Sequence, residues 1–494
     1  MKGIFAFLLL SLVSARGILA QGRPIDWPLF GGNAQRTGWE KTDSRITREN
    51  VKDFQLVLKQ KLDIKAGGPH SLSAPVVIGL LISYRGFKEL AFVAGSSGNM
   101  WALDADLERK FWERHFDVAK SKAGCSAAAT PALIPPINFA ARKPAPAAKP
   151  APGGPDVDPD ATGPAFLRPS HFGSPRPVFT LASDGKVHVL NTSNGEDLTP
   201  AMQFVPPNAR PSSLTFEDGF LYATTSGRCG GTPDAVWALD LSGTAPPVTF
   251  APPGGGLPEL GGLAMGTDGT VYTRTGDGDV LALSAKELKL LQSYTAPKVY
   301  FRTANLISPT PVVFSYKEHD VIVSATNEGR LVLLDSRSMG TPLSQTEPIA
   351  SSGRIWGGLS SYEDPDGARW IYAPVWSDSE TGSIVAVKLE ERDGKPVLTK
   401  VWASENIISP EPPVITGGML FVLSAGKYGF NEYPKGSSHA TLYAFDAATG
   451  KEVYSTKDQV PVPATLSGLT LANGRVYFTT VDNTLWAFGI YLER

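Results

Sequence analysis

Short runs of alternating apolar residues return along the whole chain, and many of them close on Ala-x-Asp or a variant of it. Apolar residues at every second position are typical of β-strands, whereas helical repeats space them three and four apart. The runs are MWALD (100–104), VHVLN (187–191), VWALD (236–240), VLALS (280–284), LVLLD (331–335), IVAVK (384–388), LYAFD (442–446) and LWAFG (485–489). Their last residues lie 43 to 58 residues apart, except for one step of 87. A four-stranded propeller blade takes about 40–50 residues, and the period of these runs is close to that. The pattern therefore predicts an all-β, eight-bladed β-propeller of antiparallel blades.

Each repeat also carries signals for further strands. A second apolar run precedes each copy, and turns such as Asn-Glu-Gly (327–329) join the two, because Gly and Asn tolerate positive φ. In four repeats a third run begins at a proline, which suits the first position of a strand. These runs are SAPVVI from Ser73, ATPALI from Ala129, TPVVF from Thr310 and PPVIT from Pro412. A trailing fourth strand completes each expected blade.

The last copy ends close to the C-terminus and leaves no room for its own outer strand. The alternating segment FQLVLKQKLD (54–63) has no blade of its own. We predict that this segment completes the last blade and closes the ring, which removes the unpaired strand edges of an open seam.

The first twenty residues have the features of a secretory signal peptide. Lys2 supplies the positive start, residues 4–13 are apolar, and Ile-Leu-Ala before Gln21 suits cleavage after Ala20. This stretch is too short to span a bilayer, which takes about 20 residues, although an uncleaved anchor is an alternative. We therefore expect export to the periplasm or beyond, and a mature domain of residues 21–494 without a transmembrane segment.

Export bears on the only two cysteines, Cys125 and Cys229. In an oxidising compartment they can pair. A disulfide needs a short Cα separation that sequence does not supply, so pairing and two unrelated thiols both remain open.

A proline- and alanine-rich segment interrupts the repeat at about residues 135–169 and accounts for the long step. It has too few large apolar side chains to offset its ordering entropy. We expect a disordered, extended insertion between the first two strands of the second blade.

Charge is nearly balanced, with 46 basic and 48 acidic residues. Without a basic stripe, nucleic acid is not an expected partner. The expected partners are an envelope protein, or a small-molecule or glycan ligand on a propeller face, and we expect a monomer.

The start of the mature chain resembles that of quinoprotein dehydrogenases of the alcohol and methanol type. In that family a Trp-Pro-x-x-Gly-Gly segment precedes Ile-Thr-x-x-Asn-Val and the first strand. The matching residues are Trp27, Pro28, Gly31, Gly32, Ile46, Thr47, Asn50 and Val51. The resemblance implies an eight-bladed propeller, shared by the dehydrogenases and by non-catalytic relatives such as outer-membrane assembly propellers.

The repeats also resemble that family's Ala-x-Asp-x-x-x-Gly-x-x-x-Trp motif. The motif residues in this chain include Asp104, Trp112, Asp240, Asp335, Asp446 and Gly450. The first copy has Glu108 where glycine is expected, and the copy at Asp446 ends on Tyr454 in place of Trp. An Asp after a strand caps the turn, the Gly permits positive φ, and the aromatic residue packs between blades. The motif therefore predicts blade packing and no catalysis.

For the dehydrogenases the resemblance implies pyrroloquinoline quinone (PQQ), a calcium ion on oxygen ligands, an Asp base, an Arg and a stacked Trp. Many members also have an adjacent cysteine pair. This chain has no adjacent cysteines, and its six histidines show no metal-ligand spacing. We assign no catalytic or metal-binding residue and expect no cofactor, with PQQ and calcium as the alternative.

One cluster is a candidate ligand site. Arg354 and Trp356 precede Asp378 in a region rich in tryptophan. If loops bring these three together, they can hold a planar anionic ligand by stacking and ion pairing. Ordinary blade packing by the aromatic residues is the alternative.

Three functions follow from these observations. The first is an exported binding or scaffold propeller of the periplasm or cell envelope, without full quinoprotein machinery. The second is a diverged PQQ- and calcium-dependent alcohol or sugar dehydrogenase. The third is a glycan-binding propeller. We favour the first, because the repeat is intact while the dehydrogenase residues are missing.

Overall fold

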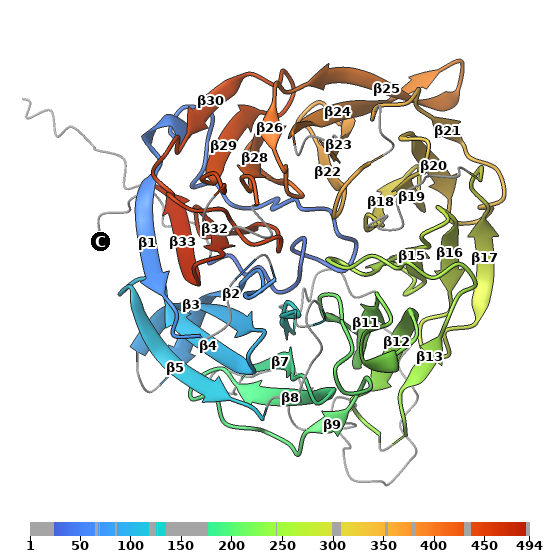
Figure 1. Ribbon diagram of the computed structural model, residues 1–494. Coiled ribbons are helices and arrows are strands. Elements are labelled where there is room, and N and C mark those ends of the chain that lie inside the picture. The colour runs from blue at the N-terminus through green and yellow to red at the C-terminus, as the bar shows by residue number, and fades with distance from the viewer. Residues whose placement is uncertain are drawn as a thin grey trace, which may run out of the picture.

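The chain forms a closed ring of eight antiparallel β-sheets arranged around a central axis (Figure 1). The computed structural model describes residues 24–64, 68, 70–83, 86–117, 125, 127–134, 176–243, 245–298, 308–350, 354–376, 381–428 and 436–490. The predicted eight-bladed propeller of four-stranded blades is therefore confirmed. The expected signal peptide (1–20) and the insertion at 135–169 lie outside the described residues.

Each blade is a four-stranded meander that runs from the axis outward, and one blade carries an extra short strand. Blade 1 comprises β2 (Val76–Ser83), β3 (Gly86–Gly95), β4 (Asn99–Asp104) and β5 (Arg109–His115), and blade 2 comprises β6 (Ala132–Leu133), β7 (Pro177–Leu181), β8 (Lys186–Asn191) and β9 (Met202–Gln203). Blade 3 comprises β10 (Thr215–Glu217), β11 (Phe220–Thr225), β12 (Ala235–Asp240) and β13 (Val248–Phe250). Blade 4 comprises β14 (Ala264–Met265), β15 (Val271–Arg274), β16 (Val280–Leu283) and β17 (Leu290–Tyr294). Blade 5 comprises β18 (Val312–Tyr316), β19 (His319–Ala325), β20 (Leu331–Asp335) and β21 (Ser344–Gln345), and blade 6 comprises β22 (Ser360–Glu363), β23 (Arg369–Trp376), β24 (Thr381–Arg392) and β25 (Lys395–Ala403), with β26 (Ile407–Ile408) beside β24. Blade 7 comprises β27 (Val414–Thr416), β28 (Met419–Ser424), β29 (Thr441–Asp446) and β30 (Glu452–Ser455). Blade 8 comprises β31 (Thr470–Ala472), β32 (Arg475–Thr480), β33 (Thr484–Gly489) and β1 (Gln55–Lys61).

The described residues also include two short 3-10 helices, η1 (Val51–Asp53) and η4 (Cys229–Gly231). Neither these nor any other described helix has the length and apolar character needed to cross a bilayer.

The eight repeated runs form the third strand of each blade. They are buried on both faces, as in β4 and β33, because each blade is packed between two neighbours. Double burial explains why these runs are almost continuously apolar, while the outer strands such as β5 alternate with exposed positions.

The aromatic residue of the repeat motif bridges adjacent blades. Trp112 of blade 1 lies against Gly195 of blade 2, where a Cβ atom would approach the indole to 2.8 Å. Its Nε1 donates to the Thr192 carbonyl at 2.9 Å. Trp402 of blade 6 packs in the same way on Gly450 of blade 7. A side chain at either glycine would push the blades apart, so this glycine position serves packing as well as the turn.

The motif aspartates bond to the turn that follows their strand. Asp240 Oδ1 accepts from Ser242 N at 2.8 Å, and Asp446 Oδ1 accepts from Thr449 N at 2.9 Å. Glu108, which replaces the glycine of the first copy, adopts a positive φ of 48°. The turn geometry is thus retained at the cost of an unfavourable backbone conformation for a non-glycine residue.

Strand β1 closes the ring as predicted. It pairs antiparallel with β33, from Gln55 opposite Gly489 to Lys61 opposite Thr484. The first strand in sequence thereby becomes the outermost strand of the last blade (Figure 1). Leu58 on this strand is buried against the core of blade 8.

Residues 25–43, which we call the hub segment, run inside the ring and bond to the innermost strands (Figure 1). Its backbone contacts are Trp27 with Val77, Pro28 with Leu133, Ala34 with Met265, Gln35 with Val313, Thr37 with Ser361, and Gly38 and Glu40 with Ile415. Side chains complete the circuit, because Arg36 bonds to Thr215 of blade 3 and Asp43 to Gly474 of blade 8. The hub segment therefore bonds to inner-strand groups of blades 1 to 7 and to the β31–β32 turn of blade 8, and so satisfies polar groups that face the axis.

Cys125 and Cys229 form a disulfide, with a Cα–Cα distance of 5.5 Å. Of the two alternatives left open by the sequence, the structure has the paired one. The bond connects the segment that leads into blade 2 with η4 of blade 3, across 104 residues of sequence.

Loss of this disulfide is expected to destabilise the protein. Cross-linking residues far apart in sequence lowers the entropy of the unfolded chain, and removal of a native disulfide typically costs about 2–5 kcal/mol. The Cys125→Ser/Cys229→Ser protein should melt at a lower temperature than the oxidised wild type. Reduction should lower the wild-type melting temperature to the same value and leave the double variant unchanged. Equal melting temperatures for oxidised wild type and double variant would contradict the prediction.

Candidate functional site

A cavity of about 470 Å³, including its open mouth, lies at the propeller axis. We call it the axial cavity. Residues just before the innermost strands line it, among them Thr130 ahead of β6, Ser213 ahead of β10 and Ser467 ahead of β31. The hub segment, by contrast, bonds within those strands. Because the blades repeat the same path, such segments of blades 1, 2, 3, 4, 6 and 8 reach the cavity, and the ring assembles side chains distant in sequence.

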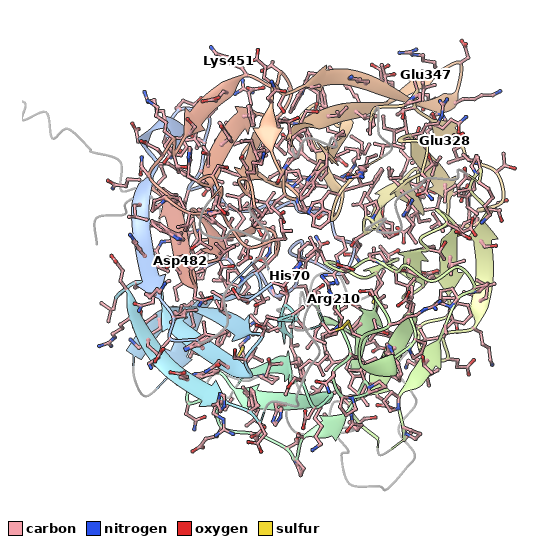
Figure 2. All side chains as sticks on the ribbon, in the orientation of Figure 1. His70, Arg210, Glu328, Glu347, Lys451 and Asp482 are labelled. Atoms are coloured by element: carbon pink, nitrogen blue, oxygen red, sulfur yellow. A yellow bond between two sulfur atoms is a disulfide. The ribbon has the colours of Figure 1, made fainter. Side chains whose placement is uncertain are left out.

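A guanidinium lies between an imidazole and a carboxylate in this cavity. Arg210 Nη2 is 2.9 Å from Glu259 Oε2 and 3.2 Å from His70 Nε2. These residues come from the starts of blades 3, 4 and 1, and Figure 2 shows His70 and Arg210 near the centre of the ring. Burial, assisted by the charge of Arg210, lowers the pKa of His70 to about 4, so the imidazole is neutral at pH 7. Burial raises the pKa of Glu259, while Arg210 opposes that shift.

An aromatic pair forms part of the wall. Trp356 lines the cavity and stacks on Trp376, with ring centroids 4.4 Å apart and an interplanar angle of 24°. Trp376 Nε1 donates to the Pro410 carbonyl at 2.8 Å. Both indoles are therefore held in fixed orientations, which gives the cavity a rigid apolar surface.

Glu411 lies behind Trp356 and is fully buried. Its Oε1 accepts from Trp356 Nε1 at 3.2 Å, and its Oε2 accepts from Gly468 N at 3.1 Å. Burial raises the pKa of Glu411 to about 8, even though both hydrogen bonds favour the charged form. Since this carboxyl group fixes the indole, its protonation is coupled to the geometry of the cavity wall.

The titration of Glu411 is expected to make stability depend on pH. Its folded-state pKa is raised, so its contribution is full below about pH 4.5 and is lost as pH rises toward 8. The difference in unfolding free energy between wild type and Glu411→Gln should therefore fall from pH 5 to pH 8, by about 1.4 kcal/mol per pH unit at most. Denaturant unfolding across this range measures it. The exposed Glu347→Gln substitution is the control, and a pH-independent difference for Glu411→Gln would refute the prediction.

The structure treats the three sequence-predicted ligand residues differently. Trp356 lines the axial cavity, as a ligand-binding role requires. Arg354, two residues earlier, is not among the lining residues, and its carbonyl accepts from Trp376 N at 3.1 Å. Asp378 lies outside the described residues. The guanidinium that lines the described cavity together with Trp356 therefore belongs to Arg210.

Sequence reasoning missed His70, Arg210, Glu259 and Glu411. These residues lie on irregular segments without a recognisable motif. Position in the sequence was the usable signal, because Glu411 directly precedes Pro412 and Pro413, which lead into β27, and prolines ahead of an inner strand recur in several blades. Polar residues just ahead of each innermost strand were therefore the candidates for lining a cavity at the propeller axis.

Comparison with known proteins agrees with this architecture. Residues 380–490 match the sequence profile of a family described as "Outer membrane protein assembly factor BamB" (PQQ_2). The fold is similar to that of quinohemoprotein alcohol dehydrogenase from Comamonas testosteroni, with a TM-score of 0.60 and 14% identity over 96% of this chain and 82% of that one. It is also similar to a europium-containing methanol dehydrogenase, with a TM-score of 0.60 and 12% identity over 95% and 99% of the two chains. By its fold, the protein is an eight-bladed β-propeller similar to those of these dehydrogenases. A search of curated proteins found no sequence match.

The described residues of the axial cavity do not fit a quinone held by calcium. Within the described part of the chain, no three His, Cys, Asp or Glu residues lie close enough to hold a metal ion. The one carboxylate in the axial cavity, Glu259, is paired with Arg210. The two cysteines form a single disulfide 104 residues apart in sequence, so they are not an adjacent pair. The described cavity therefore has neither the oxygen ligand set nor the cysteine pair of such enzymes.

Proposed function

We propose that the protein is an exported binding or scaffold propeller of the cell envelope, with the axial cavity as its ligand site and without full quinoprotein machinery. The observation that carries the proposal is Arg210, held between His70 and Glu259 beside Trp356. Convergent polar groups with a shifted pKa in a hollow that also has apolar walls are typical of a binding site. The neighbouring residues supply no calcium ligand set among those described.

Two further observations support the envelope setting. The profile that matches residues 380–490 is described as an outer-membrane assembly factor, which acts in the envelope by its printed description. The disulfide between Cys125 and Cys229 suits an oxidising compartment. Mass spectrometry of the protein recovered after export should find a mature chain that starts at Gln21. An intact N-terminus in the cytoplasmic fraction would contradict export.

Reconstitution distinguishes the binding protein from a dehydrogenase. Purified protein is incubated with calcium and PQQ, then desalted and assayed for a retained chromophore and for dye reduction with alcohols and sugars. We expect neither stoichiometric quinone nor dye reduction. Tight one-to-one retention of quinone with alcohol-dependent dye reduction would overturn the proposal in favour of a dehydrogenase.

A further inference from the structure

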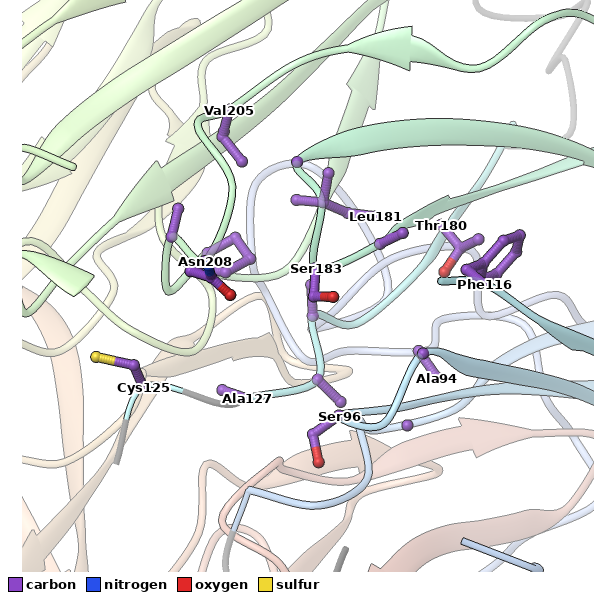
Figure 3. A pocket seen from close by; sticks show the side chains of 18 of the residues that line it. Ala94, Ser96, Phe116, Cys125, Ala127, Thr180, Leu181, Ser183, Val205 and Asn208 are labelled. Atoms are coloured by element: carbon purple, nitrogen blue, oxygen red, sulfur yellow. The ribbon is translucent and has the colours of Figure 1, made fainter. Parts of the chain in front are cut away.

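A second hollow lies next to the axial cavity, at blade 2. This hollow, which we call the blade-2 groove, is bounded by the β3–β4 turn, residues 127–129, the β7–β8 turn and residues 205–211 (Figure 3). Ala127, Ala128 and Pro211 line both hollows, so the axial cavity and the blade-2 groove lie side by side. The disulfide of Cys125 anchors this shared wall to blade 3.

We propose that the axial cavity and the adjacent blade-2 groove together bind an uncharged oligosaccharide, with one sugar unit in the axial cavity and the following units in the groove. The inference rests on the proposed function, because it takes the axial cavity as the ligand site. It adds the chemical class of the ligand and the direction in which the chain leaves the axis.

The polar groups of the axial cavity suit hydroxyl groups. Arg210 uses Nη2 for Glu259 and His70, while its Nη1 and Nε have no partner among the described residues. Glu259 offers carboxylate acceptors next to these donors. A sugar hydroxyl donates and accepts at once, so one hydroxyl can bond to both members of the pair.

Charge argues against an ionic ligand. Arg210 and Glu259 neutralise each other, and His70 is neutral at pH 7 because burial lowers its pKa. An anion would face Glu259 and a cation would face Arg210, both in a partly desolvated site where repulsion is strong. Arg36 of the hub segment does not line the cavity and directs its guanidinium to the carbonyls of Phe30, Gly261 and Leu263.

The apolar wall suits the C–H face of a sugar ring. Trp356 is 6% exposed, and the exposed part of its indole, which Trp376 backs, supplies a rigid apolar contact in the cavity wall. A pyranose has one face dominated by C–H groups, which packs on an aromatic plane while its hydroxyl groups point to the rim. In the axial cavity the Arg210–Glu259 pair lies where such hydroxyl groups would find partners.

The blade-2 groove carries no charged side chain among its described lining residues. Its polar side chains include Asn99, Thr180 and Asn208. Asn208 Oδ1 is buried and has no hydrogen-bond partner in the described structure. An unpaired buried acceptor is costly, and a rotation of the Asn208 side chain toward the groove would let a ligand hydroxyl or amide donor satisfy it.

A sugar chain fits the groove better than an extended peptide. Peptides that bind as added strands need a row of free backbone groups. Here the amide of Ala128 on the shared wall already donates to the His70 carbonyl at 3.2 Å. The groups of the groove that remain available to a ligand belong to individual side chains, and these can each bond to a separate hydroxyl group of a sugar.

Calorimetry with the full mature protein tests the proposal. The probes are uncharged gluco- and N-acetylglucosamine oligomers of one to four units, uronic-acid oligomers and neutral peptides. We expect uncharged oligomers to bind and affinity to rise with length. Arg210→Lys removes the planar donor fork and should weaken binding about 10–100-fold, since hydrogen bonds to charged groups are strong. Arg330→Lys, at an ion pair with Glu328 and Glu347 on blade 5, is the matched control and should bind as wild type.

A second variant tests the direction of the chain. Ala209 lines the blade-2 groove and not the axial cavity. Ala209→Trp should weaken binding of the longer oligomers and leave the single sugar unit unaffected. Equal loss for all lengths, or none, would overturn the assignment of the groove.

Other outcomes separate this inference from the proposed function. Selective binding of uronic acids or peptides, or no binding of any probe, overturns the oligosaccharide inference while a negative quinone assay leaves the binding-protein proposal standing. Stoichiometric quinone uptake with alcohol-dependent dye reduction overturns both.

Discussion

A protein shortened to begin at residue 64 is expected to lose cooperative unfolding altogether. The deletion removes β1, which supplies the outermost strand of blade 8, and the hub segment, which bonds to the innermost strands around the ring. It also removes the buried side chains of Trp27, Phe54 and Leu58. Each is worth about 1.5–3 kcal/mol of burial, and together with lost hydrogen bonds they approach the whole stability of about 5–15 kcal/mol of a typical domain.

Calorimetric or circular-dichroism melting measures this loss. A protein that begins at residue 24 is the control, because it keeps every described residue, and it should melt as sharply as the mature chain. A sharp transition at an unchanged temperature in the shorter protein would show that the ring closes without its N-terminal segment.

The two parts of this N-terminal region differ in how far sequence could predict them. Strand β1 was predictable because Gln55–Lys61 alternates and the last repeat visibly lacked an outer strand. The path of the hub segment was not predictable. It is extended without periodicity, and its partners, such as Val313 for Gln35, lie hundreds of residues away. Local pattern carries no information about such contacts.

The residues of the candidate site likewise differ in whether local sequence could predict them. Trp356 was found because tryptophan is conspicuous in a sequence, whereas Arg210, Glu259 and His70 lie in separate repeats without any motif. Only ring closure brings these three together at the axis. The cysteine pairing was undecidable for a related reason, since a Cα separation of 5.5 Å between residues 104 apart depends on how two blades pack.

Replacement of Arg36 by Met is expected to cost about 3–6 kcal/mol of unfolding free energy. The Arg36 side chain is almost completely buried, and burial lowers its pKa to about 9. Its Nε donates to the Leu263 carbonyl at 2.9 Å, Nη1 donates to the Phe30 carbonyl, and Nη2 donates to the Gly261 carbonyl at 2.9 Å. It therefore ties the hub segment to blades 3 and 4.

The size of this effect follows from what the substitution leaves behind. Exchanging a whole buried ion pair for apolar residues can be neutral, because both polar partners leave together. The partners of Arg36 are mostly backbone carbonyls, which no side-chain substitution removes, so Met leaves them buried without donors at about 1–3 kcal/mol each. Denaturant unfolding measures the loss, and Arg36→Lys, which retains charge but not the fork, should be less destabilised. Arg48→Met is the control on a 59% exposed arginine of the same N-terminal region, and it should cost less than about 1 kcal/mol. If the unfolding free energy of Arg36→Met lies within about 1 kcal/mol of wild type, the carbonyls have other donors and this side chain does not stabilise the hub segment.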